Sequence, residues 1–378
     1  MIQESDTNSQ SLVLAFDAKR LFNNFTGLGN YSRTLVKNLQ AYFPQHQYHL
    51  FTPRIVKNAD TEYFLDHPSF TIHTPERWNP LWRSIGISQQ INELKPHIYH
   101  GLSHELPYGI HHDTKQVVSF HDLIYEKFPH QFKAWDRNLY HWKYKKSVHR
   151  ADAVIAISQS TKDDLIDVYG ISVDKIEVIY QSCGEAFQQA TSNKSIRSKA
   201  DYYLYVGSII ERKGLMQCVL AYAKLPEKYR KKFLVIGHGD NDYSKQVREM
   251  IQYHRLEPDF IFINGLSNAD LVQKYDECFC LVFPSIYEGF GIPLIESLFR
   301  HKPVITSGIS SLPEASGPGA LLIDPYSPQQ LADAMINMHD PQQFDQLADA
   351  GFDFVSKNFT SQITAENLMK YYLRLLQH

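Results

Sequence analysis

Short apolar runs alternate with amphipathic helical patterns along the whole chain. Runs typical of strands cover residues 12–16, 48–51, 97–100, 117–120, 153–157 and 176–180 in the first half. In the second half they cover residues 202–207, 232–237, 260–263, 280–284, 303–307 and 320–324. Strands that alternate with helices predict doubly wound parallel sheets. Near-continuous apolar strands are typical of sheets that are buried on both faces.

Helical patterns lie between several of these runs. One covers residues 31–43 and another covers residues 160–170. In the second pattern Ser160 can cap the start of the helix and Gly170 can end it. A last helical pattern covers residues 361–377.

The segment 181–200 is polar and has few large apolar residues, so it is typical of a linker. A length of 378 residues also favours two domains. We therefore expect an α/β protein with two Rossmann-like domains that face each other across a cleft. The first covers residues 1–190, the second covers 191–360, and the last helix follows at 361–378.

The composition excludes several classes of protein. A net charge of −3 argues against binding to bulk nucleic acid. No apolar run reaches the roughly 18 residues of a membrane span, and the polar start MIQESDTNSQ is unlike a signal peptide. The 4 cysteines form no CxxC motif and are typical of core thiols in a reducing compartment. We therefore expect a cytoplasmic protein.

The segment PSIYEGFGIPLIE, residues 284–296, has the strongest chemical signal. It joins an expected strand to an expected helix and holds Glu288 and Glu296, with Gly289 and Gly291 between them. Backbone N–H groups at a helix start attract anions and hydroxyl oxygens. Carboxylates accept hydrogen bonds from hydroxyl groups. The segment therefore predicts a pocket for a polyol such as a sugar.

The segment YVGSIIERKG, residues 205–214, is a candidate anion site. Gly207 ends a strand, and Arg212 and Lys213 precede a helix. Two cations in such a loop can hold a diphosphate without a metal ion. A solvated basic pair is the alternative, but cations at a helix N-terminus oppose its dipole, which favours an anionic ligand. Gly237, in GHGDND, is expected to line the cleft or to serve a structural turn.

The first half holds two weaker candidates. Gly27 and Gly29 follow the first strand, but Asn30 and its neighbours leave the GxGxxG pattern incomplete, so a plain tight turn is the alternative. His121 and Asp122 follow the run 117–120, at the strand end where doubly wound sheets bind ligands. A structural histidine is the alternative there.

Together these motifs resemble the GT-B glycosyltransferases, and specifically their large retaining family 4, over almost the whole chain. Glu288 and Glu296 match the E-x7-E signature of that family, and VGSIIERKG is similar to its diphosphate loop. AVIAISQSTKDDL, residues 153–165, is similar to the usual end of the N-terminal domain. DAKR, GLGNY and FHDL resemble the mannosyltransferase branch. The resemblance implies a GT-B fold whose C-terminal helix, residues 361–378, packs back on the N-terminal domain.

The resemblance also implies roles for the candidate residues. Arg212 and Lys213 would neutralise the donor diphosphate, Glu296 would bind the ribose, and Glu288 would bind the transferred sugar. Leu266 would lie near the nucleobase. The implied catalytic residues are His121, Glu288, Arg212 and Lys213. The implied donor-binding residues are Gly29, Gly207, Arg212, Lys213, Gly237, Leu266, Glu288, Phe290, Gly291, Ile292 and Glu296. The implied acceptor-side residues are Gly27, Asn30, His121 and Asp122.

The implied reaction is a retaining hexosyl transfer in polysaccharide or glycoconjugate synthesis. Mannose would move from GDP-mannose to a saccharide or lipid-linked acceptor, through either a covalent or a same-face ion-pair route. No cofactor or metal ion is expected, and DND at 240–242 is interpreted as a turn. The alternatives are another GT-B enzyme, either a sugar phosphorylase or a nucleotide-sugar epimerase, and a sugar-binding protein without activity.

One basic segment with interleaved aromatic residues remains, HWKYKKSVHR at 141–150. It predicts either a weak peripheral contact with the inner face of a membrane or a solvated helix face.

Overall fold

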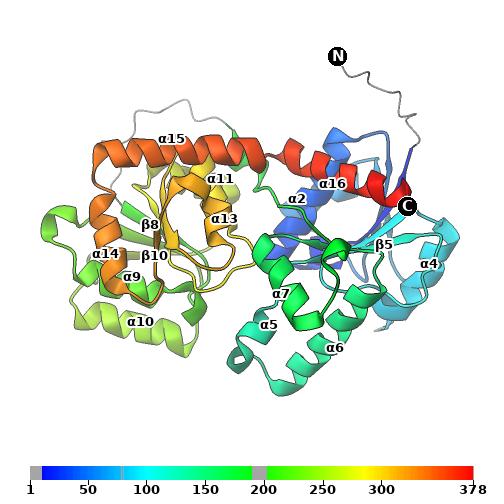
Figure 1. The fold of residues 1–378 in the computed structure, drawn as a ribbon, viewed down its shortest axis with the longest axis horizontal. Helices are drawn as coiled ribbons and strands as arrows, with labels where there is room; N and C mark the ends of the chain where they lie inside the picture. The colour runs from blue at the N-terminus through cyan, green and yellow to red at the C-terminus, as the bar shows by residue number, and fades with distance from the viewer. Residues whose placement is uncertain (1–10, 78, 80, 190–201, 378) are drawn as a thin grey trace, which may run out of the picture. The chain divides into compact units, whose positions relative to one another are not determined.

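A computed structural model describes residues 11–377, apart from residues 78, 80 and 190–201 (Figure 1). Its contacts divide the chain into two compact units. Unit 1 holds the chain up to Ile157, Lys162–Ile179 and the chain from Ala365 onward, and unit 2 holds Ser158–Thr161 and Tyr180–Thr364. The domain boundary expected between residues 190 and 191 lies outside the described residues.

The described part of unit 1 is built on a seven-stranded sheet in which every pairing is parallel. The strand order is β3-β2-β1-β4-β5-β6-β7. The strands are β1 Val13–Asp17, β2 Gln47–Phe51, β3 Phe70–His73, β4 Ile98–Gly101, β5 Lys115–Phe120, β6 Ala153–Ala156 and β7 Ile176–Val178. Every strand expected in this half is present. The edge strand β3 was not expected, because only Phe70 of its four residues is buried.

The described part of unit 2 contains a six-stranded parallel sheet with the order β10-β9-β8-β11-β12-β13. Its strands are β8 Tyr202–Val206, β9 Lys232–Ile236, β10 Phe260–Ile263, β11 Leu281–Phe283, β12 Val304–Ser307 and β13 Ala320–Ile323. All of them were expected. The α/β fold with two Rossmann-like sheets is therefore confirmed, and the central strands are buried on both faces, as their apolar runs predict.

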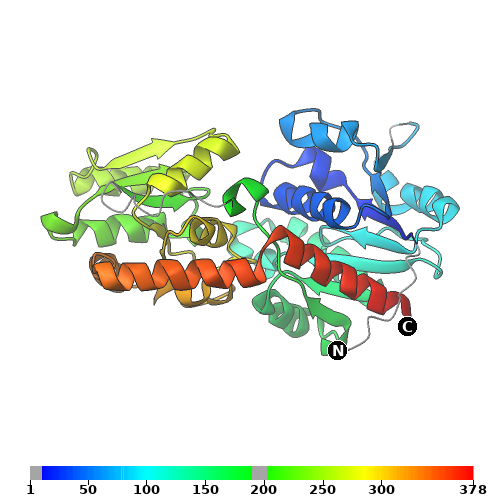
Figure 2. The same cartoon turned by 90° about the horizontal axis from the view of Figure 1, so that it is seen from above.

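Helices connect the strands in both units (Figures 1 and 2). In the first half they are α1 Lys19–Asn23, α2 Gly27–Tyr42, α3 Ala59–Asp66, the π-helix η1 Trp82–Gly86, α4 Ile87–Leu94, α5 Ile124–Lys127, α6 Ala134–Arg150 and α7 Gln159–Tyr169, with 3-10 turns η2 Pro129–Gln131 and η3 Val173–Lys175. From residue 185 onward they are α8 Glu185–Gln188, α9 Leu215–Ala223, α10 Asp242–Tyr253, α11 Asn268–Glu277, α12 Ile292–Phe299, α13 Leu312–Ser316, α14 Pro328–Asn337, α15 Pro341–Asn358 and α16 Ser361–Gln377, with 3-10 turns η5 Glu211–Lys213, η6 Glu227–Tyr229 and η7 Gly317–Gly319. In the described residues no helix is long and apolar enough to cross a membrane.

The start of α7 differs in one detail from the prediction made from the sequence. Ser160 does not cap this helix, because the side-chain oxygen of Ser158 accepts the N–H of Thr161 at 3.0 Å. The N–H group of Ser160 instead donates to the carboxylate of Glu314 at 3.1 Å. Gly170 ends the helix as predicted, with a φ of 63° that glycine adopts without strain.

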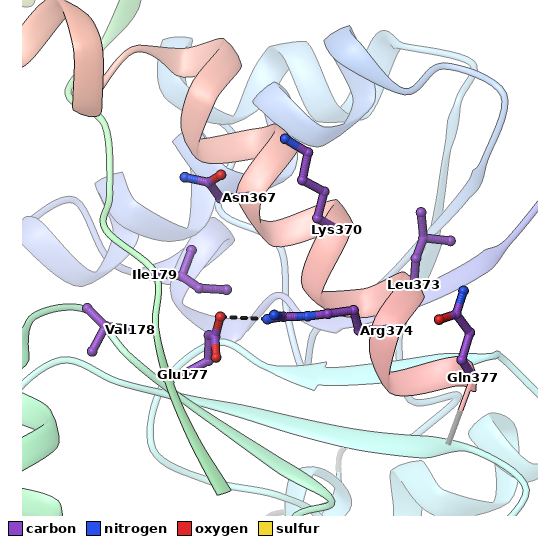
Figure 3. A pocket seen from close by; sticks show the side chains of 8 residues that line it. All are labelled: Glu177, Val178, Ile179, Asn367, Lys370, Leu373, Arg374 and Gln377. Atoms are coloured by element: carbon purple, nitrogen blue, oxygen red, sulfur yellow. Dashed lines mark hydrogen bonds and ion pairs between the residues drawn. The ribbon is translucent and has the colours of Figure 1, made fainter. Parts of the chain in front are cut away.

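The last helix, α16, contributes to unit 1 from Ala365 onward. The hydroxyl group of Tyr372 lies 2.5 Å from Nδ1 of the buried His100 on β4. A pocket of about 570 Å³ lies between α16 and the edge strand β7, where Arg374 pairs with Glu177 at 2.6 Å (Figure 3). None of the residues that line this pocket is a candidate site residue.

All four cysteines are buried and unpaired, and all lie in unit 2. The exposed fraction of each cysteine is 1% or less. Burial raises the pKa of the Cys218 thiol and of Cys278, so these groups are neutral core residues. They are Cys183, Cys218, Cys278 and Cys280.

Candidate functional site

The sheet order of unit 2 brings two of the predicted motifs together. The chain runs outward from β8 to β9 and β10 on one side, and outward from β11 to β12 and β13 on the other. The carboxyl ends of β8 and β11 are therefore neighbours at the point where the strand order reverses, which is where open parallel sheets bind ligands. Arg212 and Lys213 follow β8 in η5, and Glu288 follows β11.

These three side chains form a compact ion cluster. One carboxylate oxygen of Glu288 lies 3.0 Å from Nη1 of Arg212 and 2.9 Å from Nζ of Lys213. The hydroxyl group of Ser285 donates to the same oxygen at 2.7 Å. Burial would raise the pKa of Glu288, but the charges of Lys213 and Arg212 outweigh burial and hold that pKa below its ordinary value. The cluster therefore holds two cations and one carboxylate, and these charges add to a net charge of about +1.

Arg212 is only partly satisfied within this cluster. Its Nη1 donates to the carbonyl oxygen of Tyr287 at 2.5 Å, but its buried Nε has no hydrogen-bond partner. A buried guanidinium N–H without an acceptor is unfavourable. An anion with several oxygen atoms would satisfy it, because guanidinium groups bind phosphate through two N–H groups at once.

Two serine side chains, which the sequence did not predict as part of the site, fix the backbone around Glu288. Ser310 both accepts the N–H of Glu288 at 3.2 Å and lies 2.9 Å from its carbonyl oxygen. Ser311 donates to the carbonyl oxygens of Glu288 and Phe290, each at 2.8 Å. The only signal in the sequence is the pair of small polar residues before the helix α13, which is common in loops. Two serines that follow strand β12 therefore fix the loop around Glu288 without any ligand.

Glycines allow the strand ends of unit 2 to approach one another. A Cβ atom on Gly237, after β9, would lie 1.9 Å from the carbonyl oxygen of Gly207, after β8. A Cβ atom on Gly207 would in turn lie 3.1 Å from the side chain of Lys213. Gly291 precedes α12 with a φ of 122°, which only glycine adopts readily. The glycines at 207 and 237 are thus explained by packing within the unit.

Glu296 lies on α12 and has a very different environment from Glu288. It is buried, and the hydroxyl group of Tyr275 on α11 donates to it at 2.8 Å. Burial raises the pKa of Glu296 to about 8, although the Tyr275 hydrogen bond opposes the rise. The two glutamates of the segment therefore differ at neutral pH, with Glu288 ionised and Glu296 largely protonated.

The remaining donor-side candidates lie along the same edge of the unit 2 sheet. Phe290 is a core side chain whose ring packs against Tyr180 and Phe359 at centroid distances of 5.6 and 5.3 Å, so only its backbone can face a ligand. Ile292 begins α12. Leu266 follows β10, two strands from β8, and is half-buried.

The acceptor-side candidates lie in unit 1. Gly27 begins α2, and a Cβ atom there would meet nothing within 4 Å. A Cβ atom on Gly29 would lie 1.7 Å from the carbonyl oxygen of Asn24, so the fold itself requires this glycine. Asn30 is exposed and accepts a hydrogen bond from Arg33 at 2.5 Å. The turn at the start of α2 is therefore tightly packed at Gly29 and open to solvent at Gly27 and Asn30.

His121 is buried after β5 and is held on several sides. Its Nε2 donates to the carbonyl oxygen of Leu102 at 2.8 Å, and the ring of Tyr31 meets it edge-on at 4.4 Å. Burial lowers the pKa of His121 to about 4, although the Leu102 contact opposes the fall. The ring is therefore neutral near pH 7 and its Nδ1 is a hydrogen-bond acceptor. Asp122 accepts the N–H of Ile124 at 3.1 Å, which starts α5.

A buried hydrogen-bond chain behind His121 was not foreseen from the sequence. The hydroxyl group of Tyr31 lies 2.8 Å from that of Ser119, which lies 2.8 Å from Nε2 of His100. His100 in turn contacts Tyr372 of α16. Strand β5, helix α2 and helix α16 are thereby joined directly behind the ring of His121.

The DND segment has a structural role. Asn241 caps α10 by accepting the N–H of Ser244 at 2.9 Å, and Asp242 pairs with Lys245 at 3.2 Å. Within the described residues, no group of three or more His, Cys, Asp or Glu side chains could hold a metal ion.

Comparisons with known proteins agree with this architecture. The family described as Glycosyltransferase Family 4 matches residues 25–182, and the family described as Glycosyl transferases group 1 matches residues 187–351. The two matches together span most of the chain. The first therefore falls on the half with the seven-stranded sheet, and the second falls on the half with the ion cluster.

Curated relatives are similar to the chain at low identity. O-antigen chain mannosyltransferase B of Escherichia coli is 24% identical over 328 residues, which cover 79% of this chain and 83% of that protein. O-antigen chain mannosyltransferase RfbU of Salmonella typhimurium is 29% identical over 256 residues, which cover 67% of each protein.

Solved structures share the fold. A glycosyltransferase from Rickettsia africae superimposes with a TM-score of 0.73 at 17% identity and covers 98% of this chain and 100% of its own. HepE from Anabaena, in complex with UDP and glucose, superimposes with a TM-score of 0.71 at 17% identity and covers 95% of this chain and 99% of its own.

Proposed function

Because the chain belongs to the glycosyltransferases, with a family 4 domain followed by a group 1 domain, we propose that it transfers mannose from GDP-mannose to a saccharide or lipid-linked acceptor. The two O-antigen mannosyltransferases support mannose as the sugar and polysaccharide synthesis as the process. The transfer retains the configuration of the sugar.

The ion cluster of unit 2 is the observation on which this proposal rests. Arg212 and Lys213 both lie against one oxygen of Glu288, so the cluster has two cations and a single anionic partner. In the complex, the donor diphosphate forms ion pairs with both cations in place of Glu288. One of its oxygen atoms accepts a hydrogen bond from Nε of Arg212, which has no partner otherwise. The same cations then neutralise the charge that develops on the leaving nucleotide.

Glu288 has a different role once the diphosphate is bound. Its ionised carboxylate accepts hydrogen bonds from hydroxyl groups of the transferred sugar, and Ser310 and Ser311 fix its backbone for this task. Backbone N–H groups of Gly291 and Ile292, at the start of α12, assist it. Glu296 binds the ribose hydroxyl groups.

The transfer breaks the bond between the anomeric carbon and the phosphate oxygen. The acceptor hydroxyl oxygen bonds to that carbon on the same face, its proton passes to the departing phosphate, and the nucleoside diphosphate leaves. His121 is neutral, so a hydrogen bond between its ring and a hydroxyl group of the acceptor adds no charge. Asp122, Gly27 and Asn30 belong to the acceptor side.

We place the reaction in the cytoplasm. Four buried, unpaired thiols support a reducing compartment.

A thermal-shift experiment with GDP, UDP and ADP tests the donor site. We expect GDP to raise the melting temperature most, and Arg212→Ala or Lys213→Ala to remove most of the shift. Lys224→Ala is the matched control, because Lys224 is an exposed cation of the same unit. No shift with any nucleotide, or an equal loss in the control, would reject the assigned site.

A turnover experiment tests the reaction itself. We expect GDP release from GDP-mannose to depend on an added saccharide or lipid-linked acceptor. Turnover that requires inorganic phosphate would indicate a phosphorylase, and sugar conversion without an acceptor would indicate an epimerase. Full activity of Glu288→Ala would refute the role of Glu288.

A further inference from the structure

Helix α6, Ala134–Arg150, has one face that is fixed to unit 1. The rings of Tyr140 and Tyr144 pack on Tyr125 at centroid distances of 6.0 and 5.4 Å. Ser147 accepts the N–H of Leu106 at 3.1 Å, and Val148 is fully buried. The positions 140, 144, 147 and 148 follow helical spacing, so they define the inward face of the helix.

The opposite face of α6 carries three large apolar side chains that are exposed to solvent. Trp135 is 80% exposed, Leu139 is 38% exposed and Trp142 is 51% exposed. Their spacing of four and three residues places them on one stripe of the helix. An exposed cluster of large apolar side chains is unusual on a soluble protein and marks an interaction surface. α6 runs along the lower margin of unit 1 in Figure 1.

The charge around this stripe is strongly positive. Residues 133–150 hold six Lys or Arg side chains and one acid, Asp136, in a chain whose net charge is −3. Lys143 and Arg150 contact unit 1, through Glu105 at 3.8 Å and the carbonyl oxygen of Leu106 at 3.1 Å. The other four are Lys133, Arg137, Lys145 and Lys146, of which all but Arg137 are exposed.

We propose that α6 docks unit 1 onto an anionic membrane surface. Trp135, Leu139 and Trp142 enter the headgroup region, and Lys145 and Lys146 contact the lipid phosphates. Tryptophan is favoured at the boundary between lipid and water. Basic residues beside it add attraction to anionic lipid.

A membrane fits this surface better than a protein partner does. Lysine is depleted from the cores of protein–protein interfaces, whereas tryptophan with flanking lysines is typical of helices that lie on membranes. The exposed stripe and the basic residues lie on one helix, so a flat anionic surface can contact both together.

The helix is also coupled to the acceptor side of the chain. The ring of Tyr144 stacks on His104 at 4.8 Å, and Nε2 of His104 accepts the N–H of His121 at 3.1 Å. A lipid-linked acceptor held in the membrane would thus be brought close to the segment of His121. This last step rests on the proposed function, whereas the membrane docking does not.

Co-sedimentation of the full chain with vesicles tests the proposal. We expect binding to vesicles of phosphatidylglycerol and phosphatidylethanolamine, little binding to pure phosphatidylcholine, and a loss of binding as salt rises. The double variant Trp135→Ser, Trp142→Ser should bind at least about tenfold more weakly. The double variant Lys145→Gln, Lys146→Gln should lose about fivefold for each lysine.

The controls use exposed residues of the other unit. Tyr253→Ser removes an aromatic ring that is 79% exposed on α10. The pair Lys224→Gln, Lys228→Gln removes two exposed charges. Both controls should bind vesicles like the unchanged protein, and all variants should keep the nucleotide-induced thermal shift, which separates this test from that of the donor site.

Three results would overturn the proposal. They are the absence of vesicle binding, equal binding to phosphatidylcholine, and equal losses in the α6 variants and the controls. A change of oligomeric state in the tryptophan variants without vesicle binding would assign the stripe to a protein contact instead.

Discussion

Glu296 should make the stability of the protein fall as the pH rises through neutrality. Burial raises the pKa of this carboxyl group to about 8 from its ordinary value of 4.5. Between these values the folded protein keeps a proton that the unfolded chain has released. The resulting stabilisation is complete below pH 4.5 and is lost as the pH rises through about 8.

The size of the effect follows from proton linkage. One proton held only by the folded state lowers the free energy of unfolding by about 1.4 kcal/mol for each pH unit. Buried histidines act in the opposite sense: burial lowers the pKa of His49 and His121 to about 4, so stability rises with pH until their ordinary value of 6.5 and then levels off. Buried cysteines such as Cys183 matter only above their ordinary value of 9.0. The slope from Glu296 should therefore be clearest between about pH 6.5 and 7.5.

Urea unfolding at pH 6.5, 7.0 and 7.5 measures this slope for the unchanged protein and for Glu296→Gln. Glutamine keeps the shape of the side chain but cannot ionise, so the variant should show a flatter dependence of the midpoint on pH. Glu277→Gln is the control, since burial raises the pKa of Glu277 but hydrogen bonds to Gln273 and Lys274 outweigh it and hold that pKa below its ordinary value. Equal slopes for the unchanged protein and Glu296→Gln would refute the reasoning.

Three further predictions concern packing and charge. Gly29→Ala should lower the free energy of unfolding by about 2 kcal/mol, because its Cβ would lie 1.7 Å from a backbone oxygen, whereas Gly27→Ala in the same motif should be neutral or slightly stabilising in thermal unfolding. Tyr372→Phe should cost about 1–3 kcal/mol by leaving Nδ1 of the buried His100 unpaired, and an unchanged melting temperature would contradict this. Glu288→Gln should strengthen GDP binding in calorimetry, because it removes the carboxylate that competes for the two cations, while it slows sugar transfer; unchanged affinity would contradict the competition.

The apolar pattern of the chain was sufficient to predict its strands. Parallel strands buried on both faces are continuous apolar runs, so each expected run corresponds to a strand. The edge strand β3 escaped because its side chains are mostly solvated. The cap of α7 was misplaced by two residues because Ser158 and Ser160 have equal capping chemistry, and only the backbone geometry distinguishes them.

The site was predictable as motifs but not as an arrangement. Arg212, Lys213 and Glu288 were each singled out, but their contact depends on the adjacency of β8 and β11, which only the sheet order sets. The support from Ser310 could not be foreseen, since single serines occur in most loops. The protonation of Glu296 depends on burial, so the spacing of two glutamates could not distinguish the ionised one from the neutral one.

The burial of every cysteine in unit 2 gives this protein a built-in reporter of local unfolding. A thiolate must reach solvent before an alkylating reagent can react with it. Cys183, Cys218, Cys278 and Cys280 all belong to the unit that holds the ion cluster, and unit 1 has none. The rate of cysteine labelling therefore measures the opening of unit 2 alone. A nucleotide bound to that unit would slow the labelling. Binding of α6 to a lipid surface would leave the labelling rate unchanged.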